Sequence, residues 1–115
     1  MKEYLFLFRG GDAARADQTP EEMQAHMAKW GEWMQALAQD DKLVGGLPLD
    51  KGGKVVRNAG AVITDGPFTE GKEIVGGYLI VKSETLDGAV DISKQCPIFE
   101  HEGFVEVREL LPMDM

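Results

Sequence analysis

Two runs of residues lack any polar break, and they limit this chain to folds in which a β-sheet is covered on both faces. The first run is Tyr4–Phe8, and the second is Ile74–Val81. Successive side chains of a strand point to opposite faces, so strands that are apolar throughout must be buried on both sides. The pair Gly76-Gly77 within the second run indicates a β-bulge or a close approach by another backbone or a ligand, and we favour the bulge.

A long amphipathic helix is predicted between these runs. Thr19-Pro20-Glu21-Glu22 has the order of a capping box with proline in the first turn, which is typical of a helix start. Apolar side chains then recur at steps of four and three and form one stripe that should face a core: Met23, Met27, Trp30, Met34 and Leu37. Asp40-Asp41 and Gly45-Gly46 end the pattern, so we expect a helix of about 20 residues and about 30 Å.

The other expected elements are shorter. The pattern predicts an extended segment over Leu43–Leu49, a hairpin of Lys54–Arg57 and Ala61–Thr64 turned at Asn58-Ala59-Gly60, a helix over Leu86–Ser93 capped by Ser83 or Thr85, and a last strand at Val105–Arg108. Pro97 ends the second helix.

This order of elements predicts a ferredoxin-like α+β sandwich, in which two helices cover one face of an antiparallel sheet. The length of 115 residues fits one domain spanning residues 1–115. Two helices leave the other sheet face open, although both apolar runs need cover there. We therefore expect a homodimer that stacks sheet on sheet.

Charge and cysteine content exclude several classes of function. The formal net charge of −8 would repel nucleic-acid backbones and anionic membrane surfaces. The single cysteine, Cys96, cannot form an internal disulfide, and the apolar run at the N-terminus is too short for a signal peptide or a membrane span. We therefore expect a cytoplasmic protein with no direct nucleic-acid or membrane partner.

The segment Asp65–Glu73 between two strands is too specific in residue type for a generic connection. Gly66 favours a positive φ and Pro67 fixes the next φ, so the chain is driven into one defined turn. Phe68 in this turn must pack against the body of the protein. That packing would hold Asp65 at a fixed place, which makes the turn a candidate part of a site.

Several blocks together resemble the YCII-related, DGPF-type small proteins over nearly the whole chain. These blocks are Met1–Gly10, Pro20–Met23 with His26, Trp30 and Trp33, Leu43–Gly46, Asp65–Phe68, Lys72-Glu73 with Gly76-Gly77-Tyr78, and Glu106–Arg108. The resemblance implies a dimeric α+β barrel of ferredoxin-like protomers. This chain differs from many of those relatives at Glu109, because they have a proline directly after the arginine that corresponds to Arg108.

The resemblance also implies candidate chemistry. Fold relatives include muconolactone isomerase-like enzymes and dehydrochlorinases of hydroxylated aromatics, and some members are associated with extracytoplasmic-function sigma factors. A suspected His/Asp site of the superfamily would correspond to His26 and Asp65. The candidate ligand-binding residues around them are Trp30, Phe68, Lys72, Tyr78 and Arg108.

The two candidate catalytic residues each have a structural alternative. His26 borders the apolar stripe, where an imidazole can stay neutral and act as a general base with a carboxylate fixing its tautomer. It can equally be a half-buried helix histidine that bonds a backbone carbonyl. Asp65 can orient His26, or it can simply hold an Asx turn.

The other candidates have structural alternatives too. Arg57 and Arg108 could clamp a carboxylate or point outward from a sheet edge. Trp30 and Trp33 could wall a pocket for a planar ligand or belong to the core. His101 is typical of loop surface. The histidines and Cys96 lack metal-ligand spacing and the glycine pairs lack a phosphate-binding pattern, so we expect no metal and no cofactor.

Two hypotheses follow. The first is a cofactor-free, enzyme-like dimer in which His26 and Asp65 transfer a proton or promote an elimination on a small organic acid. The alternative is a non-catalytic ligand-binding or regulatory dimer that acts with a sigma factor or another protein partner.

Overall fold

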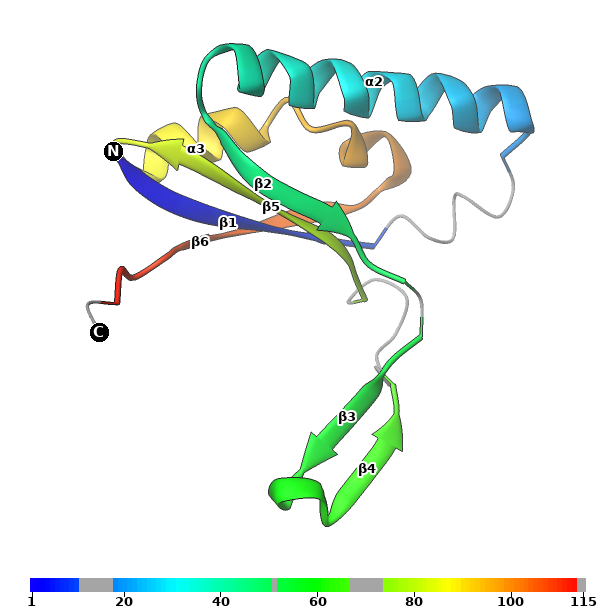
Figure 1. Ribbon diagram of the computed structural model, residues 1–115. Helices are drawn as coiled ribbons and strands as arrows, with labels where there is room; N and C mark the ends of the chain where they lie inside the picture. Colours follow the sequence, from blue (N-terminus) through cyan, green and yellow to red (C-terminus); the bar gives the residue numbers. More distant parts are fainter. Residues whose placement is uncertain (11–17, 51, 67–73, 114–115) are drawn as a thin grey trace.

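Four strands form the main sheet, and two helices cover one of its faces. The computed structural model describes residues 1–10, 18–50, 52–66 and 74–113. The strands β1 (Lys2–Arg9), β2 (Leu43–Pro48), β5 (Val75–Ser83) and β6 (Phe104–Glu109) pair in the antiparallel order β2-β5-β1-β6. Helices α2 (Pro20–Gln39) and α3 (Leu86–Ser93) lie on the same face of this sheet (Figure 1). The predicted α+β class and its ferredoxin-like arrangement are confirmed.

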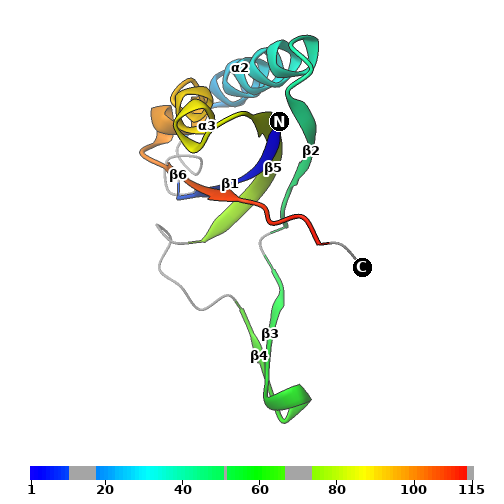
Figure 2. The same ribbon diagram turned by 90° about the vertical axis from the view of Figure 1, so that its left-hand side faces the viewer.

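The hairpin predicted after β2 forms, but it stands apart from the main sheet. Strands β3 (Lys54–Arg57) and β4 (Val62–Asp65) pair only with each other and make a second, two-stranded sheet. The short 3-10 turn η1 (Asn58–Gly60) joins them, with Asn58 and Ala59 in the left-handed region at φ 52° and 55°. The hairpin projects away from the helices (Figure 2).

Side-chain caps fix where both helices begin. The Thr19 hydroxyl accepts a hydrogen bond from the Glu22 amide at 3.1 Å, and Pro20 occupies the first turn of α2. Thr85 caps α3 in the same way by accepting from the Gly88 amide at 3.0 Å. Each cap satisfies an amide that has no partner inside its helix. The predicted helix start, with its cap at Thr19 and proline in the first turn, is confirmed for α2, and Thr85 rather than Ser83 caps α3.

The core lies between the helices and the covered face of the sheet. Tyr4, Phe6 and Phe8 alternate along β1 and are buried, and Leu79 and Val81 of β5 lie beside them. On α2 the buried residues are His26, Trp33 and Leu37. The expected stripe was therefore partly wrong, because Met23 and Met27 are exposed and only its C-terminal half reaches the core.

The predicted bulge lies at Gly76. Phe8 pairs with Gly77 and Arg9 pairs with Val75, so β5 has one extra residue opposite β1. After the bulge, Gly77 faces the helices together with Phe8, because directly paired residues share a face. At this end of the sheet, β5 therefore places no side chain beneath the helices, because the helix-facing residue is Gly77.

The second face of the sheet carries apolar side chains that neither helix covers. Leu5 pairs with Ile80 and Leu7 pairs with Tyr78, and all four are half-buried. Leu47 of the neighbouring β2 extends this face with 65% of its surface exposed.

Among the described helices, none is long and apolar enough to cross a membrane.

A glycine-to-alanine comparison in β2 tests how closely β2 and β5 approach. A Cβ on Gly46 would lie 2.8 Å from the Leu79 Cα, whereas a Cβ on Gly45 would meet nothing within 4 Å. We expect Gly46→Ala to lower the free energy of unfolding by about 1–3 kcal/mol and Gly45→Ala to change it far less. Urea denaturation of both variants measures this, and equal effects would contradict the observed packing.

Candidate active site

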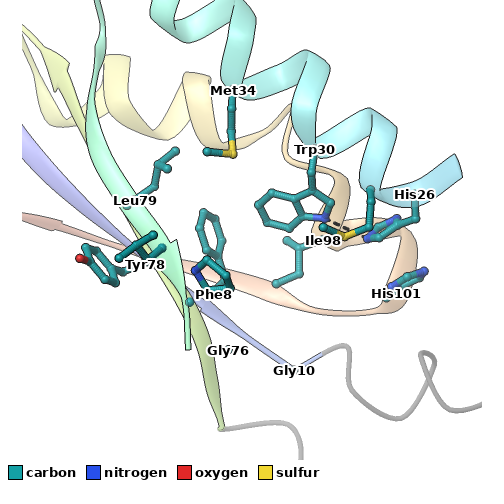
Figure 3. A pocket seen from close by; sticks show the side chains of 15 residues that line it. Phe8, Gly10, His26, Trp30, Met34, Gly76, Tyr78, Leu79, Ile98 and His101 are labelled. Atoms are coloured by element: carbon teal, nitrogen blue, oxygen red, sulfur yellow. Dashed lines mark hydrogen bonds between the residues drawn. The ribbon is translucent and has the colours of Figure 1, made fainter. Parts of the chain in front are cut away.

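A pocket opens between α2 and the outer end of the sheet, with a cavity volume of about 150 Å³. Phe8, Trp30, Met34 and Leu79 give it an apolar wall (Figure 3). Gly77 contributes only backbone, and a Cβ at this position would lie 3.2 Å from the Leu47 carbonyl oxygen and from the Pro48 Cα of β2. A mostly apolar hollow with a few polar groups is the usual form of a small-molecule site.

The polar end of this pocket is built around His26. The residue is 5% exposed and lies on α2, one helical turn before Trp30. Trp30 Nε1 lies 2.9 Å from His26 Nε2, and Glu100 Oε2 lies 3.2 Å from His26 Nδ1. An indole N–H can only donate, so Nε2 must be the unprotonated, accepting nitrogen. Nδ1 then carries the proton and donates it to Glu100, which leaves His26 neutral with a defined tautomer.

Glu100 connects the buried imidazole to the protein surface. It belongs to the 3-10 helix η2 (Pro97–His101), and its second oxygen accepts from Lys29 Nζ at 2.7 Å. The hydrogen bond from Lys29, followed by that from His26, holds the pKa of Glu100 below its ordinary value. The carboxylate therefore stays ionised and can stabilise a proton on the far side of the ring.

His101 forms a second wall at the same end of the pocket. Its ring stacks on that of His26, with centroids 3.8 Å apart and planes inclined by 26°. Its Nε2 lies 2.6 Å from Gln18 Nε2, which joins the chain before α2 to η2. The expectation that His101 is loop surface was wrong, because η2 folds back against the start of α2.

The two tryptophans have different environments. Trp30 lines the pocket and meets Phe8 edge to face, with ring centroids 5.0 Å apart. Trp33 is buried and stacks on Phe6 with planes inclined by 11°. The pocket-wall interpretation therefore fits Trp30 and the core interpretation fits Trp33.

Comparison with known proteins assigns the family. The model of the YCII-related domain matches residues 3–114. The chain belongs to the YCII-related family. A search of curated proteins found no match.

One solved structure with a similar chain path is 5-chloro-2-hydroxyhydroquinone dehydrochlorinase from Burkholderia phenoliruptrix AC1100, in complex with 2,5-dihydroxybenzoquinone. It is 17% identical, the match covers 92% of this chain and 91% of that chain, and the TM-score is 0.45.

The structure separates the residues predicted to act together. In this YCII-related chain Asp65 lies at the end of β4 on the projecting hairpin, is 81% exposed at its side chain and pairs with Lys54. Asp65 is not among the residues that line the pocket. Within one chain, the acid beside His26 is therefore Glu100 and not Asp65.

The predicted ligand-binding residues are also spread out. Trp30 lines the pocket with its side chain. Tyr78 borders the pocket from β5, but its side chain lies on the uncovered face of the sheet with Leu7. Arg108 bonds Glu106 at 3.1 Å on β6 and lies outside the pocket lining. Phe68 and Lys72 lie outside the described residues.

Cys96 and the acidic side chains offer little further chemistry. Burial raises the pKa of the Cys96 thiol to about 12, so it stays protonated and poorly nucleophilic. Across residues 1–10, 18–50, 52–66 and 74–113, no three His, Cys, Asp or Glu side chains gather closely enough to hold a metal ion.

A lysine substitution tests the electrostatic link at Glu100. We expect Lys29→Met to raise the pKa of Glu100 toward its ordinary value, because the Lys29 hydrogen bond is the largest cause of the lowering. A depressed folded-state pKa stabilises the fold above the ordinary glutamate range, and this contribution is lost as the pH falls through the depressed value. In Lys29→Met, the stabilisation contributed by ionised Glu100 should therefore be lost at a higher pH than in the unchanged protein.

Side-chain carboxyl NMR titration of both proteins measures this shift. Lys2→Met is the matched control, because Lys2 pairs with Glu109 instead. An unchanged Glu100 midpoint in Lys29→Met would contradict the link.

Proposed function

We propose that this YCII-related protein is a cofactor-free, enzyme-like protein that transfers a proton to or from a small organic acid in the pocket beside α2. His26 is the acid/base in this proposal, and Glu100 positions it. The observation that carries the proposal is the neutral His26 at the pocket wall, with its Nδ1–H held by an ionised carboxylate.

The arrangement suits proton abstraction from an acidic C–H. Nε2 is the basic nitrogen and belongs to a residue that lines the pocket. When Nε2 takes the proton, the bonding electron pair stays on the ligand and either moves along it or expels a leaving group. The imidazolium that forms is stabilised by Glu100 through Nδ1–H. Return of the proton to another ligand atom completes an isomerisation, and loss of an anion completes an elimination.

A second copy of the chain belongs to the same proposal. The uncovered face with Leu5, Leu7, Tyr78 and Ile80 is apolar on a chain that carries a net charge of −8. Stacking this face on its equivalent would bury it and give the homodimer that the sequence predicts. Asp65 of the projecting hairpin could join a His26 site only from such a second copy, and its role stays a prediction.

One observation favours a second candidate function, which is binding without turnover. The lone pair of His26 Nε2 already accepts the Trp30 N–H at 2.9 Å. A base must give up this hydrogen bond before it can take a proton, whereas a ligand can occupy the apolar part of the pocket without disturbing it. The two functions differ in whether a proton moves.

Hydrogen exchange with solvent distinguishes them and needs no knowledge of the natural substrate. The protein is incubated in D₂O with a panel of small organic acids, and mass spectrometry reports deuterium at carbon. We expect exchange in at least one panel member and a loss of about 10²- to 10⁴-fold in His26→Gln, the range for a missing general base. Glu100→Gln should lower the rate by less, because Glu100 acts through His26.

Glu109→Gln is the matched control for the carboxylate, because Glu109 pairs with Lys2 and does not line the pocket. Retention of panel members without exchange would support binding alone. Exchange that survives in His26→Gln would remove His26 as the base.

The oligomeric state is tested separately. Leu7→Glu places a charge at the centre of the uncovered face, where it pairs across the sheet with Tyr78. We expect sedimentation to show a dimer for the unchanged protein and a monomer for this variant, because burying a carboxylate between two apolar faces is unfavourable. Leu111→Glu, at a position that is 81% exposed outside the strands, is the control. A monomer before substitution would refute the sheet-to-sheet dimer.

A further inference from the structure

Among the described residues, the one hydrogen bond to His26 Nε2 comes from another residue of the pocket wall. Trp30 Nε1–H donates to this nitrogen at 2.9 Å, and both residues line the cavity (Figure 3). The two groups are a strict donor and a strict acceptor: the indole has no lone pair to offer, and the neutral imidazole has no proton on Nε2. In the free protein, the donor Trp30 Nε1–H and the acceptor His26 Nε2 of the pocket wall therefore satisfy each other.

We propose that Trp30 caps the His26 lone pair in the free protein and that a ligand hydroxyl opens this cap by inserting between the two nitrogens. The hydroxyl oxygen accepts a hydrogen bond from Trp30 Nε1–H, and the hydroxyl O–H donates a hydrogen bond to His26 Nε2. Trp30 is thus a positioning residue for ligand binding in this pocket, and the recognised ligand class is a hydroxyl attached to a compact apolar body. The inference relies on the proposed function only for the identity of the pocket.

Other common polar groups satisfy only half of the pair. A carboxylate, ketone or ether can accept from the indole but has no proton for Nε2. An ammonium group can donate to Nε2 but leaves the indole N–H without an acceptor. Because a buried polar group without a partner is costly, a group that both donates and accepts has the advantage at this point.

The surroundings explain how the pair can open. A bridging oxygen with two ordinary hydrogen bonds needs the nitrogens to be about 4.5–5 Å apart. His26 cannot provide this movement easily, because Glu100 holds its Nδ1 and the His101 ring stacks on its face. Trp30 is only partly buried and has the open cavity beside it, so the indole is the side that moves.

The rest of the pocket fits a compact apolar body. Phe8, Met34 and Leu79 surround the cavity, and its volume of about 150 Å³ can hold a single ring. Among the described residues, Glu100 is the charged group bonded to His26, at Nδ1, and Lys29 pairs with Glu100 in turn. A ligand at Nε2 therefore meets the neutral side of the residue.

The first experiment tests the cap without any ligand. Diethyl pyrocarbonate acylates the free lone pair of a neutral histidine, and peptide mass spectrometry separates His26 from His101. We expect Trp30→Phe to speed the reaction at His26 by about five- to tenfold, the factor for one net hydrogen bond. Trp33→Phe is the matched control, because Trp33 lies in the core and stacks on Phe6.

An unchanged rate at His26 in Trp30→Phe would overturn the cap, as would an equal increase in Trp33→Phe. Nitrogen-15 NMR of the unchanged protein gives a reading that does not depend on a variant. It should show His26 protonated at Nδ1, and a ring protonated at Nε2 would refute the proposal.

The second experiment tests the hydroxyl with a pair of probes of similar shape. Phenol and anisole both have a single ring, but only phenol can donate a hydrogen bond. We expect phenol to shift the His26 Nε2 and Trp30 Nε1 resonances saturably, and anisole to leave the bond between them in place. Equal effects of the two probes, or no effect of phenol, would overturn the hydroxyl preference.

These outcomes are separate from those of the proposed function. The cap and the hydroxyl preference concern binding, so they hold or fail whether or not any proton is exchanged at carbon. A protein that responds to phenol but exchanges no deuterium would retain this inference and lose the catalytic proposal.

Discussion

The packing of β1 against α2 is the constraint on which the rest of this structure depends. Tyr4, Phe6 and Phe8 place three large side chains on the covered face, and Phe6 stacks on Trp33 of the helix. Truncating a buried aromatic of this kind costs about 3–5 kcal/mol, a large part of the stability of a small domain. Because Trp33 fixes the rotation of α2, it also fixes where the preceding turns point. His26 and Trp30 thereby come to face the end of the sheet.

The pocket exists because the same packing stops short at that end. Phe8 supplies a ring on β1, but its partner Gly77 on β5 supplies no side chain. The result is a gap under the first half of α2 that η2 closes from one side with Glu100 and His101. The candidate site thus lies where β5 contributes no side chain to the core, and the residues around this gap determine which ligand fits.

Much of the fold could be predicted from the sequence, because the signals were local. The N-cap at Thr19, the long apolar runs and the glycine bulge each act through neighbouring residues and appear where they were expected. The separation of the hairpin could not be predicted, since strand patterns do not specify which sheet a strand joins. The site was less predictable for the same reason. His26 and Trp30 share one helix, but Glu100 and His101 reach them from more than 70 positions away.

The bond between Lys29 and Glu100 has a consequence for the environment of the protein. Both side chains are about half exposed, so dissolved ions compete for them in a way they cannot for a buried pair. Raising the ionic strength weakens the attraction that keeps the carboxylate aligned with the ring behind it. The His26 imidazole is buried, but the Glu100 carboxylate that holds its Nδ1–H is exposed to dissolved ions. The orientation of a buried side chain thereby becomes sensitive to the salt concentration of the surrounding solution.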